Sequence, residues 1–319
     1  MAKRIRRSGL MMPINTPRFV NNSWRRNSDT LDYDVEDSVP QSQKAYARSI
    51  IREVIPIGLK GGAEVGLRIN CACAEADVKA AVWPGLSRIW HPKTEHAEQV
   101  RKLDELITRF ERERGIRPGT VEIYAMIETA LGVANAYEFA SASPRVRVFG
   151  GATGYDMSLD MGIDMFVGFD QFVYNRGECE LVAHALGLEP RVGVFTGDTT
   201  GGSVSDAEGV YLNALATRKA GGRSGGGLHP NVVEPQNRGF TPSPEEVEEA
   251  QRVLDFFREL DQRGEAEGEL EGWAVDKYEA ARAAGLIEWA ELCAQRDAEK
   301  ARAREETIAR EEPPLGMRE

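Results

Sequence analysis

The sequence has no long hydrophobic run, and this absence excludes a membrane-spanning protein from the expected classes. A helix needs roughly 20 consecutive apolar residues to cross a bilayer. The start of the chain offers only the short run GLMM, behind a basic flank and before Pro13, which is too short for a secretory leader. We therefore expect a cytoplasmic protein without a membrane partner.

Cysteine and histidine are scarce, with four of each among 319 residues. Cys71 and Cys73 form a C-x-C pair that has neither a second pair nor a suitably spaced histidine, so the spacing of a zinc site is absent. The patterns G-x-S-x-G, the P-loop and H-E-x-x-H are also missing. We expect reduced thiols, and histidines that pack or form hydrogen bonds.

Positive charge is in deficit, because 40 Lys and Arg face 51 Asp and Glu and the formal net charge is −11. Nonspecific nucleic-acid binding depends on a surplus of Lys and Arg, so no nucleic-acid partner is expected.

The acidic residues crowd most in TLDYDVEDSVP, residues 30–40, which contains Asp32, Asp34, Glu36 and Asp37. Such crowding is unfavourable unless a cation or a paired side chain offsets it.

Short β-branched or apolar runs alternate with amphipathic stretches along most of the chain. The predicted strands are residues 8–13, 30–36, 63–70, 87–92, 121–128, 145–151, 191–197 and 224–230, and the clearest predicted helices are 41–55, 95–114 and 130–143. Eight strands that alternate with helices predict an α/β fold, specifically a (β/α)8 TIM barrel. The eighth strand is glycine-dense and could equally be a loop.

The character of the sequence changes after residue 240. Ser243 precedes Pro244 and two glutamates, which is typical of a helix start. We therefore expect a TIM-barrel catalytic domain at 1–240, a C-terminal helical lid or appendage at 241–293 and a charged helical tail at 294–319.

Charged residues gather at the predicted C-terminal ends of several strands: Glu36, Asp37, Arg68, Lys93, Glu128 and Asp156. In a barrel these ends meet at one mouth, where active sites lie. Two carboxylates from different strands suit Mg²⁺ or Mn²⁺, which prefer oxygen ligands and keep open positions. We predict Glu128 and Asp156 as the metal ligands, although each could instead cap a helix.

Arg68 follows an apolar run, so its guanidinium is expected at the mouth of the barrel. A bidentate arginine there suits a substrate carboxylate or an enolate oxygen. The alternative is a structural ion pair with Glu36 or Asp37, and the two roles can coexist.

Several segments together resemble one family, the HpcH/HpaI aldolase and citrate lyase superfamily, in its citrate lyase β-subunit and malyl-CoA lyase branch. The segments are RSGLMMPINTPRF at 7–19, DVEDSVPQSQKAYAR at 34–48, LRIN at 67–70, HPK at 91–93, MIETALGV at 126–133, DMSLDMG at 156–162, LHPNVVEPQNRGFTPSPEEVEEAQRVL at 228–254 and VDKYEAAR at 275–282. Their order and spacing make the resemblance specific.

The resemblance implies a Mg²⁺-dependent carbon–carbon lyase that cleaves a β-hydroxyacyl-CoA such as citryl-, malyl- or citramalyl-CoA. It implies that Glu128 and Asp156 bind the metal and that Arg68 holds the carbonyl or carboxylate end of the substrate. Asp276 is implied to act as acid or base from a lid that covers a neighbouring subunit, in a homo-oligomer such as a trimer or hexamer.

The resemblance also implies that Glu36 and Asp37 orient metal-bound waters, and we group Asp37 with the catalytic residues Arg68 and Asp276. Since the chain needs no Schiff-base lysine for this chemistry, Lys93 is interpreted as a support of the site or a contact of the substrate.

Three departures from the family pattern point to a divergent member. Asn22 stands where CoA-binding relatives usually have a lysine, so Arg25 and Arg26 are the candidates for binding coenzyme A. Tyr155 replaces an acidic residue, and Trp90 with His91 replaces aliphatic residues. Two alternatives stay open: a metal-dependent aldolase acting on a free hydroxy-keto acid, and a non-catalytic subunit that binds an acyl metabolite.

Overall fold

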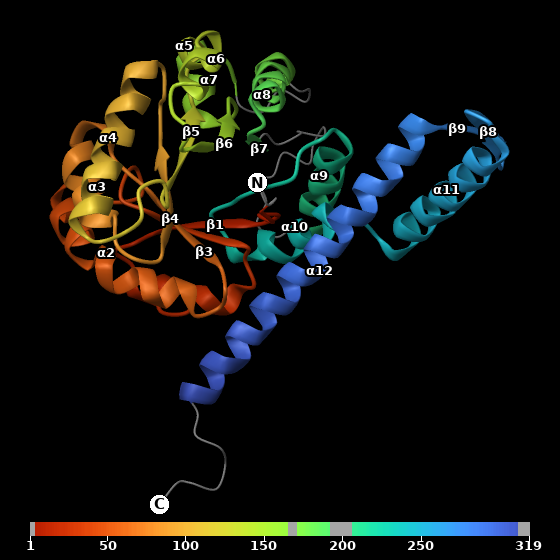
Figure 1. Ribbon diagram of the computed structural model, residues 1–319. Coiled ribbons are helices and arrows are strands. Elements are labelled where there is room, and N and C mark those ends of the chain that lie inside the picture. The colour runs from red at the N-terminus through yellow and green to blue at the C-terminus, as the bar shows by residue number, and fades with distance from the viewer. Residues whose placement is uncertain (1–3, 165–170, 192–205, 312–319) are drawn as a thin grey trace, which may run out of the picture.

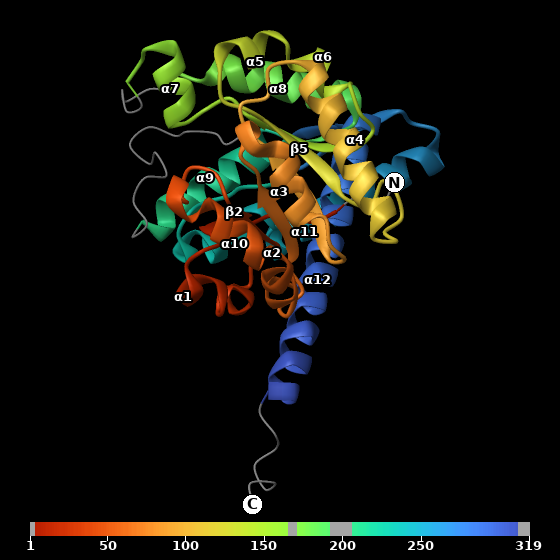
Figure 2. The ribbon, with the colours of Figure 1, turned by 90° about the vertical axis from the view of Figure 1, so that its left-hand side faces the viewer.

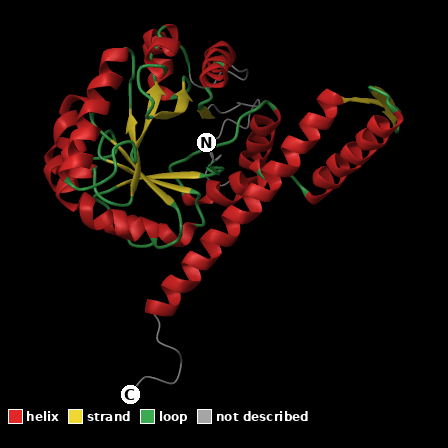
Figure 3. Cartoon of the chain, viewed as in Figure 1, coloured by secondary structure: helices red, strands yellow, loops and turns green. Residues whose placement is uncertain are grey.

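The computed structural model describes residues 4–164, 171–191 and 206–311. Its centre is a curled sheet of seven parallel strands in sequential order, surrounded by helices (Figures 1 and 3). The strands are β1 Gly9–Pro13, β2 Thr30–Asp34, β3 Glu64–Arg68, β4 Leu86–His91, β5 Glu122–Ile127, β6 Val146–Gly151 and β7 Glu189–Arg191. The chain is therefore an α/β protein, as the alternating pattern predicts.

Helices connect successive strands, so the strands run parallel. They are α1 Pro17–Val20, α2 Lys44–Leu59, α3 Ala74–Ala81, α4 Ala97–Glu113, α5 Ala130–Ala134, α6 Ala136–Ala140, α7 Tyr155–Met161, α8 Val173–Leu186, α9 Ala207–Lys219 and α10 Val233–Phe240. Short 3-10 turns lie at Ser23–Arg26, Gln41–Gln43, Cys71–Cys73 and Pro230–Val232. Figure 2 shows α5 to α8 gathered at one end of the curled sheet.

The first six predicted strands are confirmed within two residues at each end. The seventh begins two residues earlier than predicted, and residues 192–197 of that prediction lie outside the described residues. The predicted strand at 224–230 is wrong, because that segment forms only a single parallel bridge between Gly227 and Leu10. The Met11 N–H donates to the Gly227 carbonyl at 3.0 Å, and the Gly227 N–H donates to the Gly9 carbonyl at 3.0 Å. Its glycine density supplies few side chains to pack a strand.

Strand alternation divides the sheet into two unlike faces. Leu31, Tyr33 and Val65 belong to the large apolar cluster that joins the sheet to the surrounding helices. Thr30, Asp32 and Asp34 alternate with Leu31 and Tyr33 along the same strand, so they point to the interior of the curl. The interior is therefore far more polar than the layer between sheet and helices.

Asp32 has a structural role that its sequence position left unexplained. Its carboxylate pairs with Arg88, whose Nη2 lies 2.7 Å from Asp32 Oδ1, and both side chains are almost fully buried. The indole N–H of Trp90 donates to the same oxygen at 2.8 Å. Gly66, on the neighbouring strand, leaves room for this pair, because a Cβ there would collide with the Asp32 carboxylate. Trp90 thus fills the interior of the sheet beside Tyr124, with ring centroids 4.3 Å apart.

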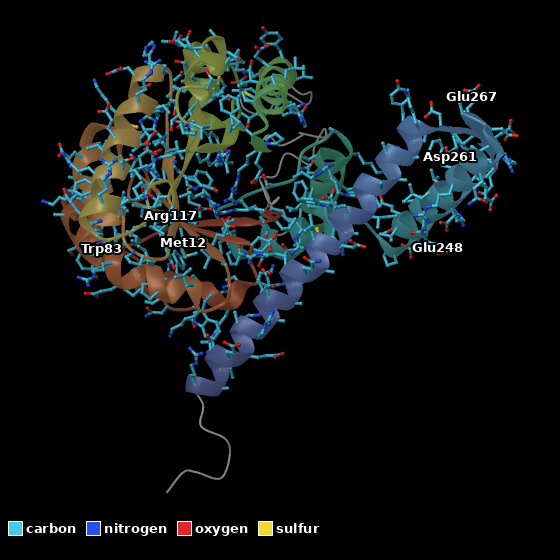
Figure 4. All side chains as sticks on the ribbon, viewed as in Figure 1. Met12, Trp83, Arg117, Glu248, Asp261 and Glu267 are labelled. Atoms are coloured by element: carbon cyan, nitrogen blue, oxygen red, sulfur yellow. The ribbon has the colours of Figure 1, made fainter. Side chains whose placement is uncertain are left out.

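The C-terminal part forms an arm that leaves the rest of the molecule (Figure 1). Helix α11, Pro244–Arg263, begins with the predicted serine cap, in which Ser243 and Glu246 form a capping box. A two-stranded antiparallel hairpin, β8 Glu267–Leu270 and β9 Trp273–Asp276, follows at the far end of the arm. Figure 4 labels Glu248, Asp261 and Glu267 on this arm, away from Met12 and Trp83 in the main body.

Helix α12, Lys277–Glu311, returns along the arm and continues past the main body without interruption at residue 293. A buried ionic cluster fastens it there. Lys300 is fully buried, and its Nζ lies 2.5 Å from Asp29 Oδ1. Arg7 pairs with Asp29 at 2.9 Å and with Asp297 of α12 at 2.5 Å. Nearer the arm, the Trp289 indole donates to the Phe240 carbonyl at 2.8 Å.

Within residues 4–164, 171–191 and 206–311, no helix is long and apolar enough to cross a membrane.

Removal of Asp32 tests the buried pair. We expect Asp32→Leu to lower the free energy of unfolding by about 3–5 kcal/mol, because Arg88 would keep its buried charge without its main partner. Asp32→Leu combined with Arg88→Met should recover most of that loss, since no unpaired charge remains. Urea unfolding followed by circular dichroism measures both.

The matched control for this comparison is Asp255→Leu, which breaks an exposed pair with Arg258 at 2.8 Å. It should change the free energy of unfolding by less than about 1 kcal/mol. If Asp32→Leu behaved like this control, the buried pair would not have the structural role assigned to it.

Candidate functional site

The charged residues predicted at the strand ends come together at the C-terminal edge of the sheet. Asp34 and Arg68 are the last residues of β2 and β3, while Glu36 and Asp37 follow β2 directly. Lys93 follows β4, Glu128 follows β5, and Asp156 lies in the first turn of α7 after β6. Parallel strands place these ends at one edge, so the barrel argument predicted their neighbourhood correctly.

Asp34 organises the loop that carries Glu36 and Asp37. Its carboxylate accepts hydrogen bonds from the Glu36 N–H at 2.9 Å and the Ser38 N–H at 3.0 Å. The buried Lys44 ammonium donates to the Val35 and Glu36 carbonyls at 2.8 and 2.5 Å. Although burial opposes it, hydrogen bonds from Arg68 hold the pKa of Asp34 below its ordinary value. The loop is thus fixed by backbone contacts on both sides.

Arg68 is held mainly by Asp34, a partner that the sequence did not identify. Its Nε and Nη2 donate to the two Asp34 oxygens, each at 2.8 Å, in a bidentate pair. This leaves Nη1 toward the other acids, 3.0 Å from Glu36 Oε2 and 3.7 Å from Asp37 Oδ2. The expected pairing with Glu36 and Asp37 is therefore present beside a stronger one.

Lys93 links the remaining carboxylates. Its backbone N–H donates to Glu128 Oε2 at 3.0 Å. Its Nζ lies 3.2 Å from Glu36 Oε1, 3.3 Å from Asp156 Oδ1 and 3.9 Å from Asp37 Oδ2. Although partial burial opposes it, these carboxylates raise the pKa of Lys93 above its ordinary value. The ammonium is therefore the central cation of the group.

Negative charge in this group is only partly offset. Burial raises the pKa of Glu128, and the nearby Asp156 raises it further. Burial likewise raises the pKa of Glu36 to about 7, with Arg68 and Lys93 opposing and Asp37 adding to the rise. Five carboxylates face two cationic side chains here. We name these seven residues the acid cluster: Asp34, Glu36, Asp37, Glu128, Asp156, Arg68 and Lys93.

The acid cluster suits a hard divalent cation by the chemistry of its donors. Glu128 and Asp156 supply carboxylate oxygens from two elements, and the surplus of negative charge favours a cation of high charge. Across the described residues, no group of three or more Asp, Glu, His or Cys side chains converges on a metal position. A cation held by this pair would complete its shell with water or substrate oxygens.

Neither candidate metal ligand is the N-cap residue of a helix. The N-cap of α5 is Thr129, whose hydroxyl accepts from the Gly132 N–H. The N-cap of α7 is Gly154, and Asp156 lies inside the first turn. Glu128 is buried and Asp156 partly exposed, at 39% of its side chain.

Cys71 and His91 lie beside the acid cluster, and the sequence did not indicate this place for Cys71. The Cys71 thiol donates to the Pro92 carbonyl at 3.2 Å and lies 3.6 Å from His91 Nε2. Burial raises the pKa of Cys71 to about 12, and burial lowers the pKa of His91 to about 4. Both groups are therefore neutral near pH 7. His91 contacts the Thr94 hydroxyl at 2.9 Å, consistent with the hydrogen-bonding role expected for the histidines.

Two predicted parts of the site lie apart from the acid cluster. Asp276 ends β9 on the arm (Figure 1), where its carboxylate accepts from the Tyr278 and Glu279 N–H groups at 2.7 and 3.1 Å. Arg25 and Arg26 are exposed in the 3-10 turn after α1, and the Arg25 guanidinium lies 4.3 Å from the centre of the Trp24 ring. Within one chain, Asp276 does not join the acid cluster.

Comparison with known proteins identifies the family of the chain. The family model described as HpcH/HpaI aldolase/citrate lyase matches residues 7–207. The citrate lyase subunit beta of Leuconostoc mesenteroides subsp. cremoris is 30% identical over 291 residues, which is 90% of this chain and 94% of that protein. The L-malyl-CoA/beta-methylmalyl-CoA lyase of Cereibacter sphaeroides is 28% identical, over 90% of this chain and 95% of the relative.

Solved structures share the fold at lower identity. The CitE protein of Mycobacterium tuberculosis, in complex with magnesium, acetoacetate and coenzyme A, superposes with a TM-score of 0.67 at 23% identity, covering 89% of this chain and 97% of that one. A citrate lyase from Burkholderia xenovorans gives a TM-score of 0.73 at 18% identity, covering 94% and 97%.

The raised pKa of Glu36 predicts how stability changes with pH. The folded protein binds this proton more tightly than the unfolded chain, whose ordinary pKa is 4.5, so stability falls as pH rises from 4.5 to about 7. In EDTA, Glu36→Gln should flatten this fall. Melting temperatures between pH 4 and 8 measure it. Glu98→Gln, on the exposed surface of α4, is the control and should keep the wild-type slope. An unchanged slope in Glu36→Gln would contradict the assignment.

Proposed function

Because the chain belongs to the HpcH/HpaI aldolase/citrate lyase family, we propose that it is a Mg²⁺-dependent carbon–carbon lyase acting on a β-hydroxyacyl-CoA thioester. The observation that carries the proposal is the acid cluster, in which Glu128 and Asp156 lie on either side of Lys93 with carboxylates in excess. The names of the relatives, citrate lyase subunit beta and L-malyl-CoA/beta-methylmalyl-CoA lyase, support the substrate class.

We further propose that the curled sheet is a (β/α)8 barrel whose eighth position is filled around Gly227, and that the arm is its helical extension. The bridge from Gly227 to Leu10 supports closure, because it places this segment beside the edge strand β1, and Arg191 of β7, the other edge strand, donates to the Gly225 carbonyl at 2.8 Å. The proposed units remain a catalytic domain at 1–240, a lid at 241–293 and a tail at 294–319.

The reaction breaks the bond between the α and β carbons of the substrate. The β-hydroxyl loses its proton and becomes the carbonyl of one product. The electron pair of the broken bond stays on the α carbon of the thioester, which becomes an enolate and then takes up a proton. A divalent cation held by Glu128 and Asp156 would supply electrostatic stabilisation of the oxyanions.

The other members of the acid cluster hold charges in place. Arg68 is fixed by its bidentate pair with Asp34, so its Nη1 can meet a substrate oxygen without reorganisation. Asp37 is the most exposed acid of the β2 loop, at 57% of its side chain, and can accept hydrogen bonds from water or substrate. Glu36 keeps Arg68 and Lys93 in position through contacts of 3.0 and 3.2 Å.

Proton transfer is assigned to Asp276 of a neighbouring copy, in a homo-oligomer such as a trimer or hexamer. The arm extends from the main body of its own chain (Figure 1), which favours action on another copy of the chain.

Arg25 and Arg26 are proposed to bind the phosphates of coenzyme A. They are exposed guanidinium groups, and arginine binds phosphate in a bidentate manner.

Metal-ligand variants test the reaction. With Mg²⁺ and citryl-, malyl- or citramalyl-CoA, the wild type should release oxaloacetate, glyoxylate or pyruvate. Glu128→Gln and Asp156→Asn should each lose about a hundredfold or more in rate, because the oxyanion would lose its electrostatic partner. Glu98→Gln, which changes an exposed glutamate of helix α4 outside the acid cluster, is the control and should keep the activity.

A free hydroxy-keto acid is assayed in parallel. Cleavage of that acid but of none of the thioesters would replace the CoA substrate by the aldolase alternative. No product from either class, with or without Mg²⁺, would overturn the lyase.

Action of Asp276 on a neighbour predicts complementation between inactive chains. Glu128→Gln and Asp276→Asn should each be inactive alone. Coexpressed in equal amounts, they should recover about one quarter of the wild-type rate, because one site in four would combine an intact acid cluster with an intact arm. Glu128→Gln coexpressed with Asp156→Asn is the control and should recover nothing, since both changes lie in the same cluster. Recovery in neither mixture would show that Asp276 acts within its own chain or not at all.

A further inference from the structure

Lys93 has a backbone conformation that is unfavourable for a lysine. Its φ of 47° lies in the left-handed region, which it shares with three other non-glycine residues of the described chain. This region is unfavourable for residues that have a Cβ, because the Cβ comes too close to the following carbonyl oxygen. The contacts of Lys93 stabilise this backbone conformation. Its N–H donates to Glu128, and its ammonium lies beside Asp156.

The two ends of Lys93 serve the two candidate metal ligands separately. The backbone N–H holds Glu128 at 3.0 Å, and the ammonium holds Asp156 at 3.3 Å. For Asp156, this is the one ion pair given by the described residues. The ammonium therefore lies beside Glu36, Asp37 and Asp156, next to the region that a divalent cation held by Asp156 and Glu128 would occupy.

Two cations cannot share this region at low cost. A divalent ion bound to Asp156 would lie a few ångströms from the ammonium, where like charges repel strongly even near a protein surface. The Lys93 side chain is 41% exposed, so its ammonium can turn toward water, away from Glu36, Asp37 and Asp156. The Glu128 contact comes from the backbone and does not require the side chain to stay.

We infer that the Lys93 ammonium is an internal cation that occupies the acid cluster in the metal-free protein and releases Asp156 when a divalent cation binds. This inference rests on the proposed function, because it takes Glu128 and Asp156 as the ligands. The acid cluster then always contains a cation, either the ammonium or the metal. The ion pair between Lys93 and Asp156 must break before the metal binds, which lowers the affinity for the metal. Lys93 is a positioning residue for the metal ligands.

Calorimetry tests the exchange on protein freed of metal with EDTA. Lys93→Met keeps the length of the side chain but removes its charge, so it should bind Mg²⁺ about five- to tenfold more tightly than the wild type. Lys93→Arg retains the charge and should return the affinity to the wild-type range. Lys102→Met removes a surface lysine paired with Glu98 at 3.4 Å and should leave the affinity unchanged.

A second measurement uses the wild type alone, so it does not depend on the folding of a variant. Mild acetylation followed by mass spectrometry reports how accessible each amine is. Mg²⁺ should increase the rate at Lys93 severalfold, because the ammonium leaves the carboxylates, while Lys102 should react at the same rate with and without metal.

The outcomes separate the inference from the proposed function. Tighter Mg²⁺ binding by Lys93→Met, with faster acetylation of Lys93 in wild type, supports the exchange. Equal or weaker binding by Lys93→Met, or an acetylation rate that ignores Mg²⁺, overturns the exchange and leaves the metal site intact. Absence of Mg²⁺ binding in every variant and the wild type overturns the metal site itself, and the exchange with it.

Discussion

Repulsion among carboxylates at the C-terminal ends of the strands is the constraint on which the rest of the structure depends. The fold brings Asp34, Glu36 and Glu128 to one edge because β2 and β5 run parallel in one curled sheet, so their C-terminal ends lie on the same side. Two cationic side chains reduce this repulsion. Arg68 pairs with Asp34, and the Lys93 ammonium lies between Glu36 and Asp156. The loop that carries the acids is in turn held by Asp34 and Lys44, so charge and backbone are fixed together.

The interior of the sheet contrasts with this edge, because its carboxylates are matched in number by guanidinium groups. Four carboxylates, those of Asp32, Glu64, Glu122 and Glu189, lie among the side chains of Arg4, Arg6, Arg88 and Arg191. Matched pairs away from water can be stable and need no ligand, although removal of one partner is costly. The strand ends instead keep a surplus of negative charge next to solvent. That difference explains why the cation and the substrate are assigned to the edge rather than to the interior.

The sequence predicted the elements better than the partners within the site. Hydrophobic alternation located six strands, and Ser243 with Pro244 located the start of α11, because these patterns are local. Two ion pairs could not be predicted in this way, Arg68 with Asp34 and Arg88 with Asp32. They depend on how the strands are staggered around the curl, and a local sequence pattern does not contain that information. The left-handed conformation of Lys93 was equally hidden, since lysine gives no sign of it. The segment at 224–230 failed because glycine is compatible with strand and loop alike.

The fastening of α12 decides where Asp276 can act. Lys300 is buried against Asp29, just before β2 begins and thus at the opposite end of the sheet from the acid cluster. Asp276 stands 24 residues before Lys300, which at 1.5 Å per residue puts it about 36 Å along a continuous helix from that anchor. Trp289 fixes the same helix to Phe240 on the way. The Lys300 pair holds the helix in this place, because a buried charge left unpaired is costly. The proposed acid or base role of Asp276 is therefore combined with action on another copy of the chain, and assembly is then a condition of the proposed reaction.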